Sequence, residues 1–104
     1  MIIKNGEVFQ EDGSFQIQDL YVENHKIATE AEVTDKTVID AKGLKVLPGL
    51  VDVHSHGAFG HDFSDADPEG LKIILKYEKS HGVTSYCPTS MTLPAEELKE
   101  IFAT

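Results

Sequence analysis

The chain has 104 residues, of which 40% are hydrophobic and 26% are charged, so its composition is globular and excludes disordered and collagen-like classes. Nine Lys and Arg stand against 18 Asp and Glu, and the formal charge of -9 excludes nucleic acid and anionic membrane surfaces as expected partners. The length allows one small domain or a piece of a larger protein.

Cysteine use and hydropathy indicate where the protein resides. Cys87 is the one cysteine, which leaves no intrachain disulfide and no zinc site built from thiolates. No apolar run approaches the ~7 to 15 residues of a signal-peptide core or the ~20 residues of a membrane span. We therefore expect a soluble protein in the reducing cytoplasm.

The first 46 residues carry the pattern of short strands separated by tight turns. Asp12-Gly13 predicts one hairpin turn, and Asn24 predicts a second because it tolerates the left-handed conformation. We expect antiparallel pairing in this region, with strands at residues 2–3, 8–9, 15–22, 26–29 and 37–40.

The pattern changes after residue 43, where a nearly continuous apolar run contains Pro48. Because proline cannot donate to a ladder, Pro48 separates two strands, and residues 49–53 are expected to form a buried parallel strand. Asp67-Pro68 predicts a helix start and His81-Gly82 predicts its end. A second strand at 83–87 and a second helix from residue 93 follow. That helix is expected to run uncapped to the last residue, as in a truncated chain. The alternation predicts parallel strands joined by right-handed crossovers.

Two histidines stand at the carboxyl end of the first of these parallel strands. His54 and His56 are two residues apart, so their side chains leave the same face of the strand. Neutral imidazole is a common ligand of divalent metals, and one cation can take both rings. The pair therefore predicts a metal site, although two histidines at this spacing also occur without any metal.

The segment PGLVDVHSH at residues 48–56 resembles the first-strand signature of the amidohydrolase superfamily. The continuation HGAFGHDF and the segment GVTSYCPTSMT at residues 82–92 resemble, more narrowly, its deacetylases of acetylated amino-sugar phosphates. This resemblance implies an α/β fold in which residues 1–46 supply strands of a small β-sandwich-type domain. Residues 47–104 would then be the first two βα units of a truncated (β/α)8 TIM-type barrel.

The same resemblance implies a reaction. Members of the family convert N-acetylglucosamine 6-phosphate to glucosamine 6-phosphate and acetate by attack of metal-bound water on the acetamide. It implies one or two divalent ions, zinc or iron, with His54 and His56 as ligands. The catalytic acid and base, the other ligands and the substrate-binding residues would lie beyond residue 104. The chain alone is thus expected to be inactive, and the whole protein to be a homo-oligomer acting on a small amino-sugar phosphate.

Two alternatives stay open. One is a different amidohydrolase, either a deaminase or a cyclic amidase such as dihydroorotase. Dihydroorotases typically place an Arg shortly after the His pair, whereas this chain has Gly57, Ala58 and Phe59 there. The other alternative is a small α/β module that holds a structural or regulatory metal.

Structural roles are expected for the remaining polar residues. Asp52 is expected to anchor backbone, and Cys87 to be a small buried hydrophobe. His25 falls in a turn and His81 at a helix end, where a cation complements the dipole. We expect a further group to order the loop after the ligand strand: His61, Asp62, Asp65 and Asp67. Residues 89–92, including Ser90, either line the pocket or cap a turn.

Overall fold

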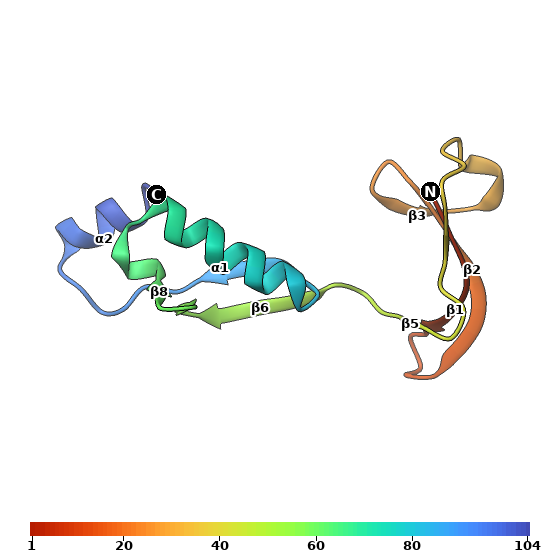
Figure 1. Cartoon of the computed structure of the whole chain (residues 1–104), viewed down its shortest axis with the longest axis horizontal. Coiled ribbons are helices and arrows are strands. Elements are labelled where there is room, and N and C mark those ends of the chain that lie inside the picture. The colour runs from red at the N-terminus through yellow and green to blue at the C-terminus, as the bar shows by residue number, and fades with distance from the viewer. The chain divides into compact units, whose positions relative to one another are not determined.

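The computed structural model describes all 104 residues, and the chain divides into two compact units, Met1–Pro48 and Gly49–Thr104. Figure 1 shows an all-β amino-terminal unit and a carboxyl-terminal unit that contains both α-helices. The chain is therefore a mixed α/β protein made of two units.

The amino-terminal unit is one five-stranded sheet. Its strands are β1 (Ile2–Phe9), β2 (Phe15–Glu23), β3 (Lys26–Ala28), β4 (Val38–Asp40) and β5 (Lys45–Val46), with a 3-10 turn η1 at Glu30–Glu32. The pairs β1–β2 and β2–β3 are antiparallel, as expected. The expectation of antiparallel pairing is wrong for β4, which runs parallel to β1, and β5 is parallel to the same strand. β1 thus pairs with two short strands, β4 and β5, one after the other along its length. This unit contains no second sheet with which a sandwich could form.

Both expected turns of this unit are present. Gly13 has a φ of 83° in the turn between β1 and β2, and Asn24 and His25 have φ values of 49° and 62° between β2 and β3. His25 is exposed in that turn, which agrees with a structural role. A turn with two left-handed residues matches the twist of paired strands, so these residues fix the register of the hairpin.

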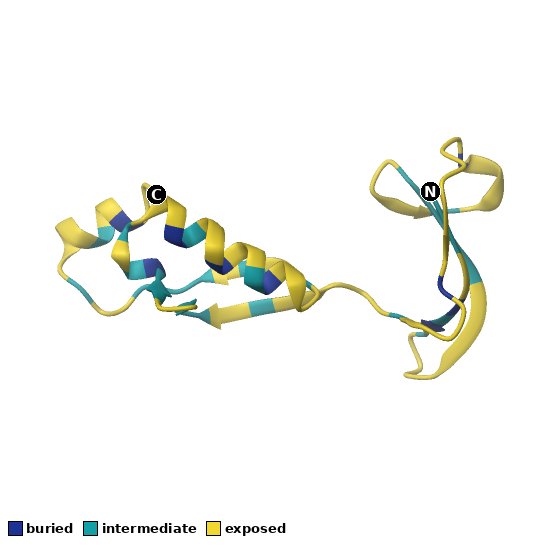
Figure 2. Ribbon diagram, viewed as in Figure 1, coloured by how far each residue is buried: buried dark blue, intermediate teal, exposed yellow.

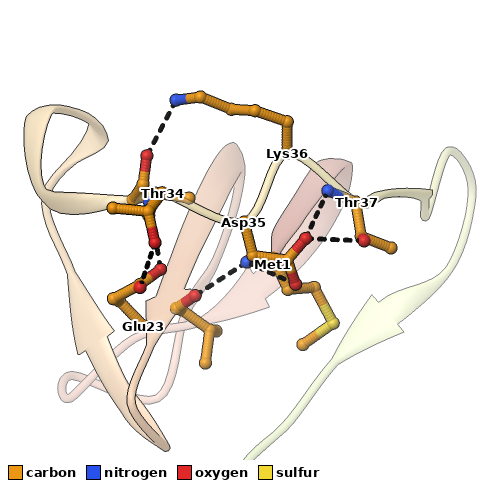
Figure 3. Close-up of polar contacts among 8 residues, drawn as sticks. Met1, Glu23, Thr34, Asp35, Lys36 and Thr37 are labelled. Atoms are coloured by element: carbon orange, nitrogen blue, oxygen red, sulfur yellow. Dashed lines mark hydrogen bonds and ion pairs between the residues drawn. The ribbon is translucent and has the colours of Figure 1, made fainter.

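Polar contacts close the amino-terminal unit around the start of the chain (Figure 3). The amino group of Met1 lies 3.5 Å from the carboxylate of Asp35, and Thr37 donates to that carboxylate through its N–H and its hydroxyl. Thr34 likewise donates its N–H and its hydroxyl to the carboxylate of Glu23. These donors lower the pKa of each carboxyl group below its ordinary value. The threonine hydroxyl has the larger effect and the N–H the smaller one.

The carboxyl-terminal unit follows the expected order of strand, helix, strand and helix. β6 (Leu50–Ser55) pairs in parallel with β9 (Val83–Pro88), as the alternation predicts. Between them lie a small hairpin of β7 (Gly57–Ala58) and β8 (His61–Asp62), a 3-10 turn η2 (Phe63–Asp65) and helix α1 (Pro68–Ser80). Helix α2 (Ala95–Ile101) follows β9 and ends at Ile101 with Phe102 as its cap, so the expectation that it runs to the last residue is wrong.

Helix α1 begins and ends where the sequence predicts. The carboxylate of Asp67 accepts the N–H of Glu69 at 3.0 Å, Pro68 occupies the first turn, and Gly82 lies just beyond the helix with a φ of 85°. Its buried face consists of Gly70, Ile74 and Glu78, which are four residues apart. Ile74 is fully buried, so this face of α1 forms the core of the unit.

The expected burial of β6 is wrong in this chain. Val51 is 63% exposed and Val53 is 71% exposed, and Figure 2 shows β6 largely in the colour of exposed residues. Cys87 of β9 is exposed as well, which corrects the expectation of a buried thiol. The cause is that α1 packs mainly against β9, while β6 has no strand partner other than β9 and no element of this unit covers it in the same way.

Candidate metal site

His54 and His56 lie together at the carboxyl end of β6. Their ring centroids are 5.2 Å apart and the ring planes meet at 80°. A cation held about 2.0 to 2.1 Å from one nitrogen of each ring, with tetrahedral angles, requires centroids about 5 Å apart. The observed separation therefore fits two imidazoles that share one metal ion.

A hydrogen bond sets the proton position on His56. Its Nδ1 lies 2.8 Å from the carbonyl oxygen of Thr89, which follows β9. Because a carbonyl oxygen can only accept, Nδ1 carries the proton and Nε2 keeps its lone pair in the neutral ring. Metal-ligating histidines commonly use their second nitrogen in this way, which fixes the ring and raises its basicity.

Backbone contacts hold the same strand end in place. The carboxylate of Asp52 accepts the N–H of His54 at 2.9 Å, so the expectation that Asp52 anchors backbone is confirmed. The carbonyl of Ser55 accepts the N–H of Thr89 at 2.9 Å and the hydroxyl of Tyr86 at 3.3 Å. The ends of β6 and β9 are thus tied together at the position of the histidine pair.

The hairpin after the pair explains the glycine at residue 57. A Cβ built on Gly57 would come within 2.0 Å of the carbonyl oxygen of His61 on the facing strand. Only a residue without a side chain allows β7 and β8 to approach this closely. The hairpin then leads directly into η2, whose Phe63 donates its N–H to the carbonyl of His56 at 2.7 Å.

The three aspartates of the loop beyond the pair have structural roles, as expected. Asp62 accepts the N–H of Ser64 at 2.7 Å and Asp65 accepts the N–H of Asp62 at 2.8 Å, which together cap η2. Asp67 caps α1. At the other end of α1, the Nδ1 of His81 lies 2.9 Å from the carbonyl of Tyr77 and thereby caps the last turn.

No group of three or more His, Cys, Asp or Glu side chains in this chain is arranged to hold a metal ion. His61 and Asp62 follow the pair closely in sequence but do not join it. The ligand set that the chain offers is therefore two imidazoles. A catalytic zinc site uses about three protein ligands, so this pair supplies only part of one.

Sequence reasoning missed one residue of this region. The hydroxyl of Ser64 accepts the N–H of Met91 at 2.9 Å and so ties the segment after β9 to η2. Of the two open roles for residues 89–92, the structure shows turn contacts, since the hydroxyl of Thr89 also donates to the carbonyl of Cys87 at 3.3 Å. No sequence signal pairs Ser64 with Met91, because 27 residues separate them.

Comparisons with known proteins found similar sequences over most of this chain. No family model matches the chain. The chain is 33% identical over 91% of its length to the N-acetylglucosamine-6-phosphate deacetylase of Bos taurus, and 35% identical over 86% of its length to that of Caenorhabditis elegans. It is also 32% identical over 96% of its length to a dihydroorotase of Listeria innocua.

The chain is thus similar in sequence both to deacetylases and to dihydroorotases. The narrower resemblance, to N-acetylglucosamine-6-phosphate deacetylases, is confirmed over most of the chain. In each case the chain spans 24% of the length of the relative.

Neither helix of the structure is long and apolar enough to cross a membrane.

Proposed function

We propose that this chain is the amino-terminal part of an enzyme that deacetylates N-acetylglucosamine 6-phosphate to glucosamine 6-phosphate and acetate. The observation that supports this proposal most is the likeness to deacetylases of that name over 91% of the chain, together with paired imidazoles at the end of β6. In this proposal residues 47–104 contribute the first two βα units of a (β/α)8 barrel. The whole protein would be a cytoplasmic homo-oligomer.

His54 and His56 would hold a divalent ion, with zinc or iron as the proposed choice among the zinc, iron, nickel and copper ions that imidazole ligands suit. The chemistry that such an ion supplies when bound is a lowered pKa for coordinated water and stabilisation of negative charge on a carbonyl oxygen. The chain's own residues prepare the ligands. Thr89 holds the Nδ1 proton of His56 through its carbonyl, and Asp52 fixes the backbone of His54.

The position of the pair also suits catalysis. In barrels built from parallel strands the active site lies at the carboxyl ends of the strands, where loops vary while the sheet holds the geometry. His54 and His56 lie at that end of β6, and the loop from residue 89 lies at the same end of β9. Residues that complete the site and bind the sugar phosphate would come from the remainder of a longer protein.

A second candidate is dihydroorotase activity, because a dihydroorotase is 32% identical over 96% of the chain. Against it stands the absence of a cation directly after the pair, where the chain has Gly57, Ala58 and Phe59. An anionic cyclic substrate would find no partner for its carboxylate there. A free-standing metal-binding module remains the alternative from a different class.

The test is to express the complete reading frame that contains this chain and to assay it on three substrates. We expect release of acetate from N-acetylglucosamine 6-phosphate, and no ring opening of dihydroorotate and no deamination of nucleobases. Dihydroorotate turnover without deacetylation would establish the second candidate. A reading frame without further His, Asp and Glu residues at strand ends would leave only the metal-binding module.

A further inference from the structure

The two histidines of the candidate site are held very differently. The ring of His56 is half-buried, its Nδ1 donates to the carbonyl of Thr89, and its own carbonyl accepts the N–H of Phe63. The imidazole of His54 is exposed and makes no hydrogen bond. Only His56 is therefore oriented before any metal arrives, and its orientation depends on where the carbonyl of Thr89 lies.

Thr89 lies in a segment without regular secondary structure, which other contacts must hold in place. Its N–H donates to Ser55 at the end of β6. Two residues later, the N–H of Met91 donates to the hydroxyl of Ser64 at 2.9 Å. These two contacts bracket the Thr89 carbonyl, one on each side along the chain.

Ser64 is itself firmly placed. It lies in η2, where its N–H donates to the carboxylate of Asp62 at 2.7 Å, and Asp62 in turn donates its own N–H to the carboxylate of Asp65. The segment that carries His56 and the segment that carries its acceptor are thus joined through η2. The hydroxyl of Ser64 is the side-chain group of η2 that binds residues 89–91, because it accepts the N–H of Met91.

We propose that Ser64 is a positioning residue for the candidate metal site. Through Met91 it holds the Thr89 carbonyl in line with the Nδ1 of His56, which fixes the tautomer with a free Nε2 as the metal-binding atom. This inference rests on the proposed function as far as the metal is concerned, while the tautomer of His56 stands independently of it. His56 would then receive the ion first, and the free ring of His54 would complete the pair.

The experiment compares Ser64→Ala with Ser80→Ala in the 104-residue chain without metal. Ser80 is a matched control because its hydroxyl also makes a hydrogen bond, at 2.7 Å to the carbonyl of Tyr77, in the last turn of α1. Long-range 1H–15N NMR spectra at a pH above 8 report the proton position on neutral His56. We expect the Nδ1–H form in the unaltered chain and in Ser64→Thr and Ser80→Ala. In Ser64→Ala we expect a shift toward the Nε2–H form that predominates in free histidine.

Zinc titration of the same four proteins by calorimetry gives the second readout. Loss of an outer contact to a ligand typically weakens metal binding by about 10- to 100-fold, and we expect about tenfold for Ser64→Ala. Ser64→Thr keeps the hydroxyl and should bind zinc as the unaltered chain does. Dispersed amide signals in the NMR spectra show whether each variant is folded.

The outcomes separate the two proposals. An Nε2–H form of His56 in the unaltered chain, or no difference between Ser64→Ala and Ser80→Ala in tautomer and zinc affinity, would overturn the positioning role. If Ser64→Ala does not fold, the nearly isosteric Ser64→Cys, whose sulfur is only a weak acceptor, replaces it in both measurements. The expected tautomers with no zinc binding by any of the four proteins would support the positioning of His56 and contradict the metal site.

Discussion

The imidazole of His61 lies against the backbone of Gly70 in α1. A Cβ built on Gly70 would come within 2.7 Å of the Nδ1 of His61 and within 3.0 Å of the carboxylate of Asp67. Residue 70 is one of three buried positions on the inner face of α1. The contact therefore sets how closely the helix approaches the hairpin that follows the histidine pair.

Gly70→Ala tests this contact. Alanine favours a helix over glycine by about 1 kcal/mol, but the added methyl group has no room beside the His61 ring. We expect a net loss of about 1 to 2 kcal/mol in the free energy of unfolding, measured with urea. In a His61→Ala background the same substitution should become neutral or stabilising. Equal stabilisation by alanine in both backgrounds would contradict the close contact.

The extent to which sequence predicts this fold depends on how local each signal is. Helix α1 begins at Pro68 and ends before Gly82 as expected, because a capping Asp67, a proline in the first turn and a terminal glycine act within a few residues. The predicted antiparallel direction of β4 is wrong because a strand of three residues does not specify its partner. Its parallel pairing with β1 is decided by the path of the chain between them.

The limits at the candidate site have the same origin. Apolar residues on both faces of β6 predict two-sided burial, yet the exposure of Val51 and Val53 depends on a covering layer that the strand itself cannot specify. The spacing of His54 and His56 predicts that their rings leave one face, and the rings do lie together. The acceptor for His56 could not be predicted, because Thr89 lies 33 residues further along the chain.

The metal prediction concerns the histidine pair in the complete protein. His54→Ala or His56→Ala removes one imidazole ligand, so we expect loss of metal from at least one position and loss of most turnover. Unfolding free energy should change by about 0.5 kcal/mol or less for the exposed His54. Metal content is measured by elemental analysis, with His25→Ala as the control because His25 lies in an exposed turn of the other unit. Full metal content and rate in both variants would show that the pair is structural.

The acid response of the amino-terminal unit follows from the donors on Glu23. The hydroxyl and N–H of Thr34 hold the pKa of Glu23 below its ordinary value. A carboxyl group with a lowered pKa in the folded state stabilises fully above its unfolded pKa of about 4.3, and this stabilisation is lost as the pH falls through the folded pKa. Stability of the unit should therefore fall with acidification below a pH of about 4.

Thr34→Val removes the hydroxyl donor and keeps the backbone N–H. We expect the pKa of Glu23, followed by NMR of its carboxyl carbon, to rise toward the ordinary value, and the acid dependence of unfolding to become shallower. Thr29→Val is the matched control, because the N–H of Thr29 and, as the second cause, its hydroxyl donate to Glu32 and lower the pKa of that group instead. An unchanged Glu23 titration in Thr34→Val would show that the hydroxyl bond is absent in solution.

The last prediction concerns the 104-residue chain by itself. β6 pairs only with β9, and Leu50, Val51 and Val53 are each more than half exposed on it. A two-stranded sheet with free edges and an uncovered apolar face seeks partners, so we expect concentration-dependent self-association in analytical ultracentrifugation. Val53→Lys should reduce it more than Ile17→Lys, which places the same charge at a 77% exposed position of the amino-terminal unit.

The same chain should bind divalent metal weakly and show no deacetylation of N-acetylglucosamine 6-phosphate, because two imidazoles supply only part of a catalytic metal site. A monomer at all concentrations would contradict the assignment of β6 as the associating surface. Turnover by the purified chain that His54→Ala abolishes would show instead that these residues already contain a complete active site.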